Sequence, residues 1–278
     1  MQKKVVAKAI LYISVIVIFF WCVFPFYWAF TSSIKPDRDL FKENPSLIPK
    51  RVTFINYVKV FSDRPFHVNI MNSAIVALAT TVFSLLIGVM AGYAIARLRF
   101  PMKALVMSLI LAVSMFPQVS ILGSFFLILR SLHLINTYPG LILPYITLNL
   151  PLAVWILQSF FKELPIEIEE ASLIDGCSRF RLLWSIVVPI SSPGLVATGL
   201  LIFINSWNEF LFALTFMQKP RMYTIPVAVA LFRGASQYEI PWGQLMAAAV
   251  IVTLPLVMLV FVFQNKIIEG LSAGAVKG

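Results

Sequence analysis

ELPIEIEEASLIDGCSRFRLLWSIVVP, residues 163–189, is a long charged connection between two hydrophobic segments of this chain. The sequence before and after it reads as hydrophobic helices joined by short connectors. This stretch is therefore the part expected to contact something soluble. Its charged side chains are Glu163, Glu167, Glu169, Glu170, Asp175, Arg179 and Arg181.

The first half of the stretch predicts a short helix. Pro165 suits the first helical turn, where its missing N–H costs nothing, and carboxylates are favoured at the helix N-terminus by the helix dipole. Asp175-Gly176 is expected to end the helix, because glycine tolerates the left-handed conformation of a helix C-cap. The helix shows no continuous apolar face. Such a pattern is typical of a helix held between two surfaces and equally of a frayed loop.

The second half predicts another short helix after this hinge. Ser178 can accept a backbone hydrogen bond as its N-cap, and Pro189 is expected to end it. The apolar residues at helical spacing are Phe180, Leu183, Trp184 and Val187.

The composition is that of an integral membrane protein with one domain. The chain has 278 residues, of which 60% are hydrophobic and 12% charged, and its mean hydropathy is +0.90, far from the globular range. The formal charge of +10 would suggest nucleic acid for a soluble protein, but anionic lipid headgroups account for it more simply here. Cys22 and Cys177 are expected at different depths, so neither a disulfide nor a metal pair is predicted.

Six hydrophobic runs are each about 20 residues or longer, which is enough to cross the hydrocarbon core of a bilayer. The first run lacks a convincing cleavage site and is predicted to be retained. Residues 32–70 are predicted to lie outside the membrane, with one short amphipathic helix near 54–61. Pro117, Pro144 and Pro151 predict broken helices near a cavity. The predicted spans are about 9–31, 74–96, 104–129, 138–161, 192–216 and 243–265.

Charge counting does not settle the orientation of the chain. With the N-terminus inside, 11 Lys and Arg residues fall on each side of the membrane. The lysines ahead of the first span and the cluster from Arg97 to Lys103 favour an inside N-terminus. With six spans, both termini and residues 163–189 are then cytoplasmic.

The spans carry little chemistry. No phosphate-binding GxxxxGK[ST] loop is present, and the central parts of the six spans lack the ionisable residues that a proton-coupled transporter or an intramembrane enzyme needs. His67 and His133 fall outside the predicted spans. The driving energy is therefore expected from a partner.

Neutral polar side chains in the fourth and fifth spans are candidates for a substrate path. Amides hydrogen-bond hydroxyl groups and aromatic rings cover the apolar face of a sugar, so a neutral polyol would suit them. Asn residues in membrane helices also bond to neighbouring helices, and this alternative stays open. Glu209, near the end of the fifth span, reads as an interfacial, solvated carboxylate or as a salt-bridge partner for another subunit. The candidates are Tyr145, Asn149, Asn205 and Asn208.

The stretch from residue 163 resembles the EAA motif of ABC importer permeases, E-A-A-x-x-D-G followed by I-x-L-P. The sequence departs from the motif at Ser172 and Val188, where Ala and Leu are usual. In that family the two helices form a coupling element that sits in a cleft of a cytoplasmic ATPase. The residues that match the motif, with Ser172 at its third position, are Glu170, Ala171, Ser172, Asp175, Gly176, Ile186 and Pro189.

Segments elsewhere extend the resemblance to nearly the whole chain. They are similar to carbohydrate ABC importer permeases and, more narrowly, to the second permease of maltose/trehalose-type systems. The resemblance implies an all-α type I permease with six transmembrane helices, in a bacterial or archaeal cytoplasmic membrane, working by alternating access. These segments are residues 54–57, 72–73, 91–94, 207–210 and 270–278.

The resemblance also implies a set of partners. These are a sister permease that completes a heterodimer, two ATP-binding subunits and an extracytoplasmic solute-binding protein, which the loop at 217–242 would face. ATP and Mg would be bound by the ATPase subunits, and this chain would hold no cofactor. Glu170 would pair with a basic residue of the ATPase. Residues 270–278 would lie along the ATPase dimer or stay free in solvent.

Other functions remain open at this point. The solute could be another compound, such as an oligosaccharide or glycerol phosphate, although no basic residue inside the spans awaits a phosphate. A membrane enzyme or scaffold is the alternative from a different class, and the missing intramembrane ionisable groups count against the enzyme.

Overall fold

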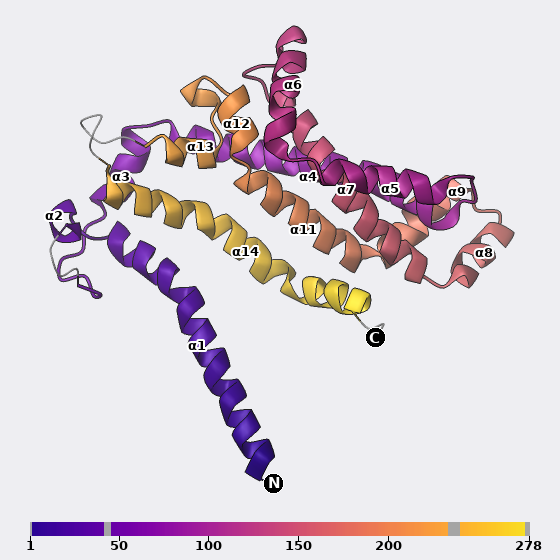
Figure 1. The fold of residues 1–278 in the computed structure, drawn as a ribbon, viewed down its shortest axis with the longest axis horizontal. Coiled ribbons are helices and arrows are strands. Elements are labelled where there is room, and N and C mark those ends of the chain that lie inside the picture. The colour runs from indigo at the N-terminus through magenta and orange to yellow at the C-terminus, as the bar shows by residue number, and fades with distance from the viewer. Residues whose placement is uncertain (1, 42–45, 233–239, 276–278) are drawn as a thin grey trace. The chain divides into compact units, whose positions relative to one another are not determined.

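The computed structural model describes residues 2–41, 46–232 and 240–275, and every regular element in these ranges is a helix. Figure 1 shows their order along the chain. The chain divides into two compact units. The first comprises Met1–His67 and Val229–Pro255, and the second comprises Val68–Ala228 and Leu256–Gly278.

The first unit is organised around the buried side chain of Asn56. It contains α1 (Gln2–Ser33), α2 (Asp37–Leu40), α3 (Ile55–Ser62) and the start of α14 (Trp242–Ala275). Asn56 lies in α3, where the sequence predicts a short amphipathic helix, and its Nδ2 donates to the carbonyls of Ser33 at 2.9 Å and Lys35 at 3.0 Å. A Cβ on Gly243 would lie 2.6 Å from Asn56 Nδ2, so α14 needs glycine there.

Helix α4 (Phe66–Arg97) is a long helix that begins next to the start of the second unit at Val68. Its sequence contains no proline. The second predicted span starts at about residue 74, whereas the helix begins at Phe66 and includes His67 in its first turn. Asn72 and Ser73 do not cap the helix, because their side chains bond to the segment at residues 221–225 instead.

Helix α4 packs closely on α7 (Pro139–Glu163) through two glycines one turn apart. A Cβ on Gly88 would lie 3.1 Å from Ala153 Cβ, and one on Gly92 would lie 3.1 Å from the Gln158 backbone nitrogen. Small residues four apart let two membrane helices approach to backbone contact. Pro144 and Pro151 both lie inside α7, which stays one helix, so the predicted breaks at these two prolines are wrong.

The described residues contain two bent helix pairs, and only the first of them corresponds to a predicted span, at 104–129. Helices α5 (Lys103–Ser114) and α6 (Gln118–Ser131) meet at 92° around Pro117, and the helical run Arg179–Ile190 meets α11 (Ser192–Asn208) at 82°. Four single helices are long and apolar enough to cross a membrane, so the described residues hold up to six spans when each bent pair counts as one. The single helices are Ile10–Ser33, Phe66–Arg97, Pro139–Glu163 and Trp242–Lys266.

The fifth predicted span, 192–216, is not one helix. Helix α11 ends at Asn208, and α12 (Leu211–Phe216) starts anew after a break at Glu209 and Phe210. Glu209 has extended backbone angles, and its carboxylate accepts hydrogen bonds from the backbone N–H groups of Phe212 and Ala213. A carboxylate that satisfies the free N–H groups of a new helix turn separates the two helices.

Two hydrophobic cores hold the second unit together, and α4 and α7 contribute to both. Beyond α12 the chain continues through η2 (Pro220–Met222) and α13 (Ile225–Ala230). One core consists of Val76, Leu129, Leu141, Tyr145, Phe212, Ala213, Phe216, Met217 and Val227. The other consists of Val89, Tyr93, Leu157, Phe161, Leu182, Leu183 and Val187.

Candidate functional site

The charged stretch folds into two short helices joined by a glycine hinge. Helix α8 (Ile166–Ile174) begins directly after Pro165 and is followed by Gly176 at φ +83°. The Gly176 N–H donates to the Leu173 carbonyl at 3.1 Å, and the Cys177 N–H donates to the Ser172 carbonyl at 3.0 Å. This pair of bonds is the Schellman C-cap, so the helix end predicted at Asp175-Gly176 is confirmed.

The second helix is longer than predicted. Ser178 caps it by accepting the Arg181 N–H at 3.4 Å. The helix starts as α9 (Arg179–Leu182), continues as a π-helical turn and ends as α10 (Val188–Ile190), so the prediction that Pro189 ends it is wrong. In the π turn at Leu183–Val187 the N–H of Val188 bonds to Leu183. This wider turn shifts the carbonyls just before the proline ring, which would clash with a regular turn.

An ion pair holds α8 against α4. Among the described residues of α8, Glu169 alone is buried, with 6% of its surface exposed. Arg97 Nε lies 2.6 Å from Glu169 Oε1, and the Tyr93 hydroxyl donates to Glu169 Oε2 at 2.9 Å. The helix has no apolar stripe because a carboxylate, not a row of aliphatic side chains, attaches it.

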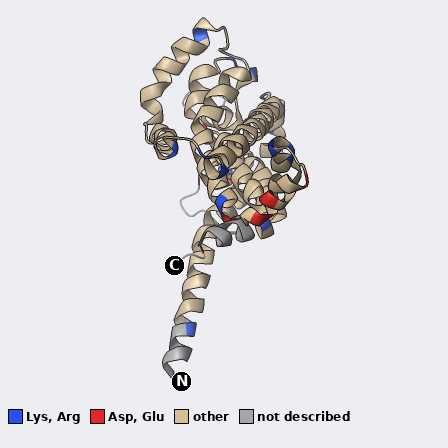
Figure 2. Cartoon of the chain, turned by 90° about the vertical axis from the view of Figure 1, so that its right-hand side faces the viewer, with Lys and Arg blue, Asp and Glu red and all other residues tan. Residues whose placement is uncertain are grey.

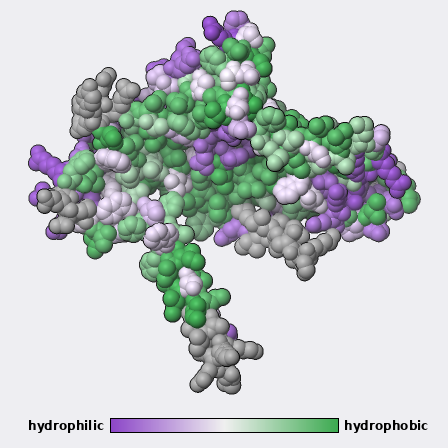
Figure 3. All heavy atoms as spheres, in the orientation of Figure 1, coloured by the Kyte–Doolittle hydropathy of each residue, from purple (hydrophilic) through white to green (hydrophobic). Residues whose placement is uncertain are grey.

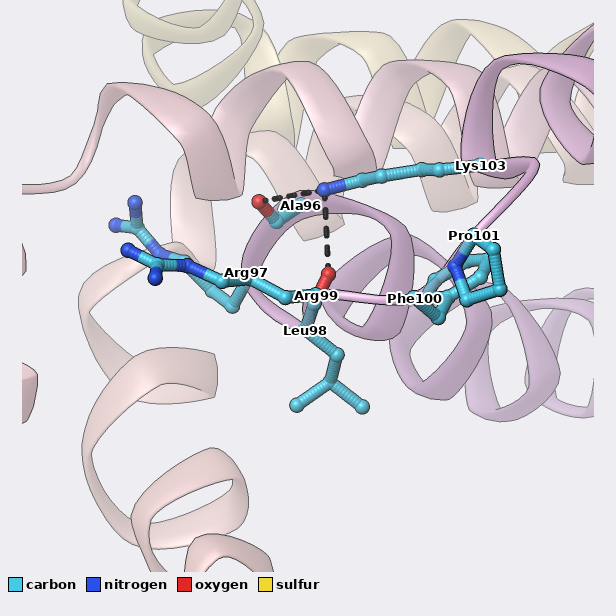
Figure 4. Close-up of a pocket in the computed structure, with 7 residues that line it drawn as sticks. All are labelled: Ala96, Arg97, Leu98, Arg99, Phe100, Pro101 and Lys103. Carbon is cyan, nitrogen blue, oxygen red and sulfur yellow. Dashed lines mark hydrogen bonds between the residues drawn. The ribbon is translucent and has the colours of Figure 1, made fainter.

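Arg97 also fixes the corner where α7 turns into α8. Its Nη2 donates to the carbonyl of Leu164 at 2.6 Å, so one guanidinium holds both sides of the corner. Lys103 Nζ donates to the Ala96 carbonyl at 3.3 Å and the Leu98 carbonyl at 3.4 Å, and these bonds satisfy the C-terminal end of α4. In Figure 4 the side chains of Arg97 and Arg99 extend to one side of the turn, while Lys103 reaches back over it.

The remaining surface of α8 is open. Glu167 and Glu170 are exposed, and Ile174 has 86% of its surface exposed. Figure 2 shows acidic residues gathered at this end of the second unit, and in Figure 3 the surface over α8 and α9 is a mixture of hydrophilic and hydrophobic patches. Of the motif residues, Glu170, Ala171, Asp175, Gly176 and Pro189 are exposed, and Ser172 and Ile186 are half-buried.

The four substrate-path candidates separate into two buried and two exposed residues. Tyr145 and Asn149 have 1% and 4% of their surfaces exposed, whereas Asn205 and Asn208 are exposed on α11. Asn149 donates to the Tyr145 carbonyl at 2.8 Å and to Ser206 Oγ at 3.4 Å, and Asn205 Nδ2 donates to Asn149 Oδ1 at 3.1 Å. Asn208 donates only within its own helix, to Ile204 at 2.9 Å, among the bonds of the described residues.

Glu209 is not a free, solvated carboxylate. The Tyr145 hydroxyl donates to Glu209 Oε2, which also accepts the Ala213 N–H at 3.1 Å, while Oε1 accepts the Phe212 N–H at 2.8 Å. Both carboxylate oxygens are therefore bonded within the chain. The interpretation from sequence fails because these donors arise only from the break between α11 and α12.

Sequence reasoning missed the roles of Tyr93, Arg97 and Glu169. Arg97 and Glu169 are 72 residues apart, so no local pattern joins them. Two features of the sequence could have indicated this attachment. Helix α8 has no apolar face, and an arginine directly follows the apolar run of α4.

Two predicted segments fall partly outside the described residues. Helix α14 continues through Ala275, and residues 276–278 of the C-terminal stretch lie outside. Residues 233–239 of the loop at 217–242 also lie outside the described residues.

A family model with the description "Binding-protein-dependent transport system inner membrane component" matches residues 84–272. The chain belongs to this family. The resemblance noted in the sequence is thereby confirmed, and so is the all-helical membrane fold.

Several curated relatives are similar over most of their length. The chain is 42% identical to the trehalose/maltose transport system permease protein of Thermococcus litoralis, with 100% of both chains covered. It is 42% identical to the trehalose transport system permease protein of Mycobacterium tuberculosis, with 93% of both covered. It is 41% identical to the sulfoquinovosyl glycerol transport system permease protein of Agrobacterium fabrum, with 92% of this chain and 89% of the relative covered.

A solved structure shares the fold. The crystal structure of a bacterial ABC transporter involved in the import of the acidic polysaccharide alginate aligns with a TM-score of 0.82 at 19% identity. The alignment covers 95% of this chain and 98% of that one.

Proposed function

We propose that this chain is the transmembrane permease subunit of an ATP-driven, binding-protein-dependent sugar importer. The observation that carries the proposal is the pair α8 and α9, capped at Gly176 and attached to α4 by a buried ion pair while Glu170 stays exposed. A helix attached at one buried residue and open elsewhere suits docking to a partner. The ATPase is that partner, and it supplies the energy that spans without ionisable residues in their central parts do not.

The exposed face of α8 combines carboxylates with apolar side chains. Ile166 and Leu173 have 50% and 40% of their surfaces exposed, and burial of such residues favours association. Glu170 would pair with a basic residue of the ATPase, with the adjacent Ala171 and Ser172 giving close approach. Closure of the ATPase dimer on ATP and Mg would then move α8 as a unit and drive alternating access.

The proposed assembly places α8, α9 and both termini on the cytoplasmic side of a bacterial or archaeal inner membrane. It contains a sister permease as the other half of a heterodimer, two ATP-binding subunits and an extracytoplasmic solute-binding protein. The loop at 217–242 would face the binding protein, and membrane lipids would surround the exposed apolar helices.

Within the assembly, Asn205 and Asn208 are the side chains proposed to meet the sugar. They lie at positions i and i+3 of α11 and so share one exposed face of that helix. Asn149 holds the Asn205 amide, and Tyr145 anchors Glu209 below the break. Asn149 would therefore orient Asn205. Neutral amides suit hydroxyl groups, and several relatives are named for trehalose or maltose transport, which makes such a disaccharide the first candidate.

The test is to co-express this chain with its sister permease and ATPase, reconstitute the complex in liposomes with the binding protein, and measure sugar uptake and ATP hydrolysis. Glu170→Lys should abolish uptake while the chain still inserts into the membrane. Glu163→Lys is the matched control, because it reverses an exposed charge just before α8 and should leave uptake intact. Normal uptake with Glu170→Lys would refute the coupling role.

A panel of sugars identifies the solute. Trehalose and maltose should stimulate ATP hydrolysis by the reconstituted complex, whereas glycerol phosphate should not. Stimulation by an anionic solute alone would overturn the proposal of a neutral disaccharide.

A further inference from the structure

The two ends of α4 are each fastened to a different functional segment of the chain. At the Arg97 end, Arg97 and Tyr93 hold Glu169 of α8. At the Phe66 end, a second set of side chains holds the segment at residues 220–225. All of these residues from Val68 onward belong to one compact unit, so the two fastenings form part of one continuous body.

The fastening at the Phe66 end consists of side-chain amides that donate hydrogen bonds to backbone carbonyls. Asn69 Nδ2 donates to Pro220 and Tyr223, both at 2.9 Å. Asn72 Nδ2 donates to Arg221 at 2.8 Å and Tyr223 at 3.0 Å. The two asparagines have 2% and 1% of their surfaces exposed, so these bonds are shielded from water.

Two further bonds complete this fastening. Ser73 Oγ accepts the Ile225 N–H at 2.8 Å, and Asn72 Oδ1 accepts the Tyr138 hydroxyl at 2.8 Å. Asn69, Asn72 and Ser73 lie at positions i, i+3 and i+4, so they share one face of the helix. The segment at 220–225 is thereby attached to α4 along more than one helical turn.

The helix between these fastenings is suited to carry movement. It contains no proline and packs on α7 at Gly88 and Gly92 without room for a side chain. From Asn72 to Arg97 its axis covers about 37 Å at 1.5 Å per residue, which exceeds the ~30 Å hydrocarbon core of a bilayer. By contrast, α7 contains Pro144 and Pro151, and the chain bends between α5 and α6 and again before α11.

We propose that α4 is the mechanical link between the ATPase-docking helix α8 and the segment at 220–225 that faces the solute-binding protein. Arg97, Glu169, Asn69 and Asn72 are the positioning residues of this link. The inference rests on the proposed function, because the proposed function assigns the ATPase to α8 and the solute-binding protein to the segment at 220–225. Displacement of α8 shifts α4 through the ion pair, and α4 shifts the segment at 220–225 through the amides. The same path carries binding-protein docking back to the ATPase.

The experiment uses the full importer complex in lipid nanodiscs, with a fluorophore at Lys219→Cys in a background that carries Cys22→Ser and Cys177→Ala. Lys219 is exposed beside the fastened segment. The fluorescence change on addition of ATP reports movement of that segment. Stimulation of ATP hydrolysis by the binding protein reports coupling in the reverse direction, and linkage requires the two effects to change together.

Glu169→Gln and the double variant Asn69→Leu/Asn72→Leu should each reduce both signals by about fivefold or more, with ATP hydrolysis in the absence of binding protein retained. Asn136→Gly is the matched control at the loop. Asn136 Oδ1 accepts the N–H groups of Gln218 and Lys219 at 2.7 and 3.0 Å, so its loss loosens the same loop without touching α4. Glu163→Gln is the matched control just before α8, where the side chain is also exposed, and both controls should keep most of each signal.

Assembly is checked by co-purification of all subunits. If Glu169→Gln does not assemble, Tyr93→Phe replaces it, because that variant removes one hydroxyl and keeps the ion pair. The inference is overturned if Glu169→Gln and Asn69→Leu/Asn72→Leu keep both signals as the controls do. It is also overturned if Asn136→Gly loses both signals as fully as those two variants. An unmodified complex that lacks ATP hydrolysis or any response to ATP would instead refute the proposed function.

Discussion

The two fastenings of α4 use different chemistry for a similar task. At Arg97 one charged pair, with 13% and 8% of the side-chain surfaces exposed, holds a helix whose other residues are exposed or half-buried. At Asn69 and Asn72, neutral amides hold a loop by its backbone carbonyls. The ion pair concentrates attachment at one point, whereas the amides distribute it over several bonds.

The difference follows from what each fastening holds. A helix satisfies its own backbone bonds, so α8 offers only side chains to a neighbour, and the strongest side-chain bond is a charge-assisted one. The segment at 220–225 presents the backbone carbonyls of Pro220, Arg221 and Tyr223, and an asparagine side chain supplies two donors for them. Attachment at one residue also lets α8 tilt about Glu169. The several bonds from Asn69, Asn72 and Ser73 instead fix the position of the segment at 220–225 along α4.

The largest expected effect comes from breaking the ion pair on one side. Arg97→Leu leaves the Glu169 carboxylate buried without its cation, which should cost about 3–5 kcal/mol and lower the thermal unfolding midpoint of the purified complex. The double variant Arg97→Leu/Glu169→Leu should recover much of the loss, because no buried charge remains. A double variant less stable than Arg97→Leu would show that the stability lost in Arg97→Leu comes mainly from the missing ion pair and not from the unpaired buried carboxylate of Glu169.

Gly176→Val should have the next largest effect. The residue has φ +83°, and a left-handed conformation costs an L-amino acid about 1–2 kcal/mol, with more for a β-branched side chain. A Cβ there meets nothing within 4 Å, so the damage is conformational and not steric. Sugar uptake should fall strongly for Gly176→Val, with assembly checked by co-purification.

Gly176→Asn is the control for this hinge. Asparagine tolerates the left-handed region, so uptake should stay near that of the unmodified chain. Equal loss with valine and asparagine would mean that the hinge needs the missing side chain for contact with the ATPase.

Asn72→Leu tests the neutral fastening and should cost less than Arg97→Leu. It removes the bonds to Arg221 and Tyr223 and leaves the Tyr138 hydroxyl without its acceptor. The free energy of unfolding should fall by about 1–3 kcal/mol. Because the Asn69 and Ser73 bonds remain, limited proteolysis of the loop should rise while the complex stays assembled. A loss of stability equal to that of Arg97→Leu would contradict the view that this fastening is distributed.

Local patterns predicted the parts of the site that depend on neighbouring residues. The helix end at Gly176 and the cap at Ser178 both follow from residues within one turn of each other. The Arg97–Glu169 pair and the bonds from Asn69 and Asn72 to residues 220–223 join positions 72 to 154 residues apart. These pairings depend on tertiary packing, so the sequence alone predicts neither the bonds of Asn69 and Asn72 nor the bonded state of Glu209.

Ser172→Ala should have the smallest effect and separates the docking face of α8 from its attachment. Ser172 Oγ donates to the Ile168 carbonyl at 2.7 Å, one turn back in the same helix, and that carbonyl is also bonded within the helix backbone. Alanine has the higher helix propensity and is the usual residue at this motif position, so stability should change by about 0.5 kcal/mol or less. The thermal midpoint and ATP-driven uptake should both match those of the unmodified chain. A clear drop in uptake at unchanged stability would place the hydroxyl in the contact with the ATPase, and α8 would then be recognised by more than its carboxylates and its shape.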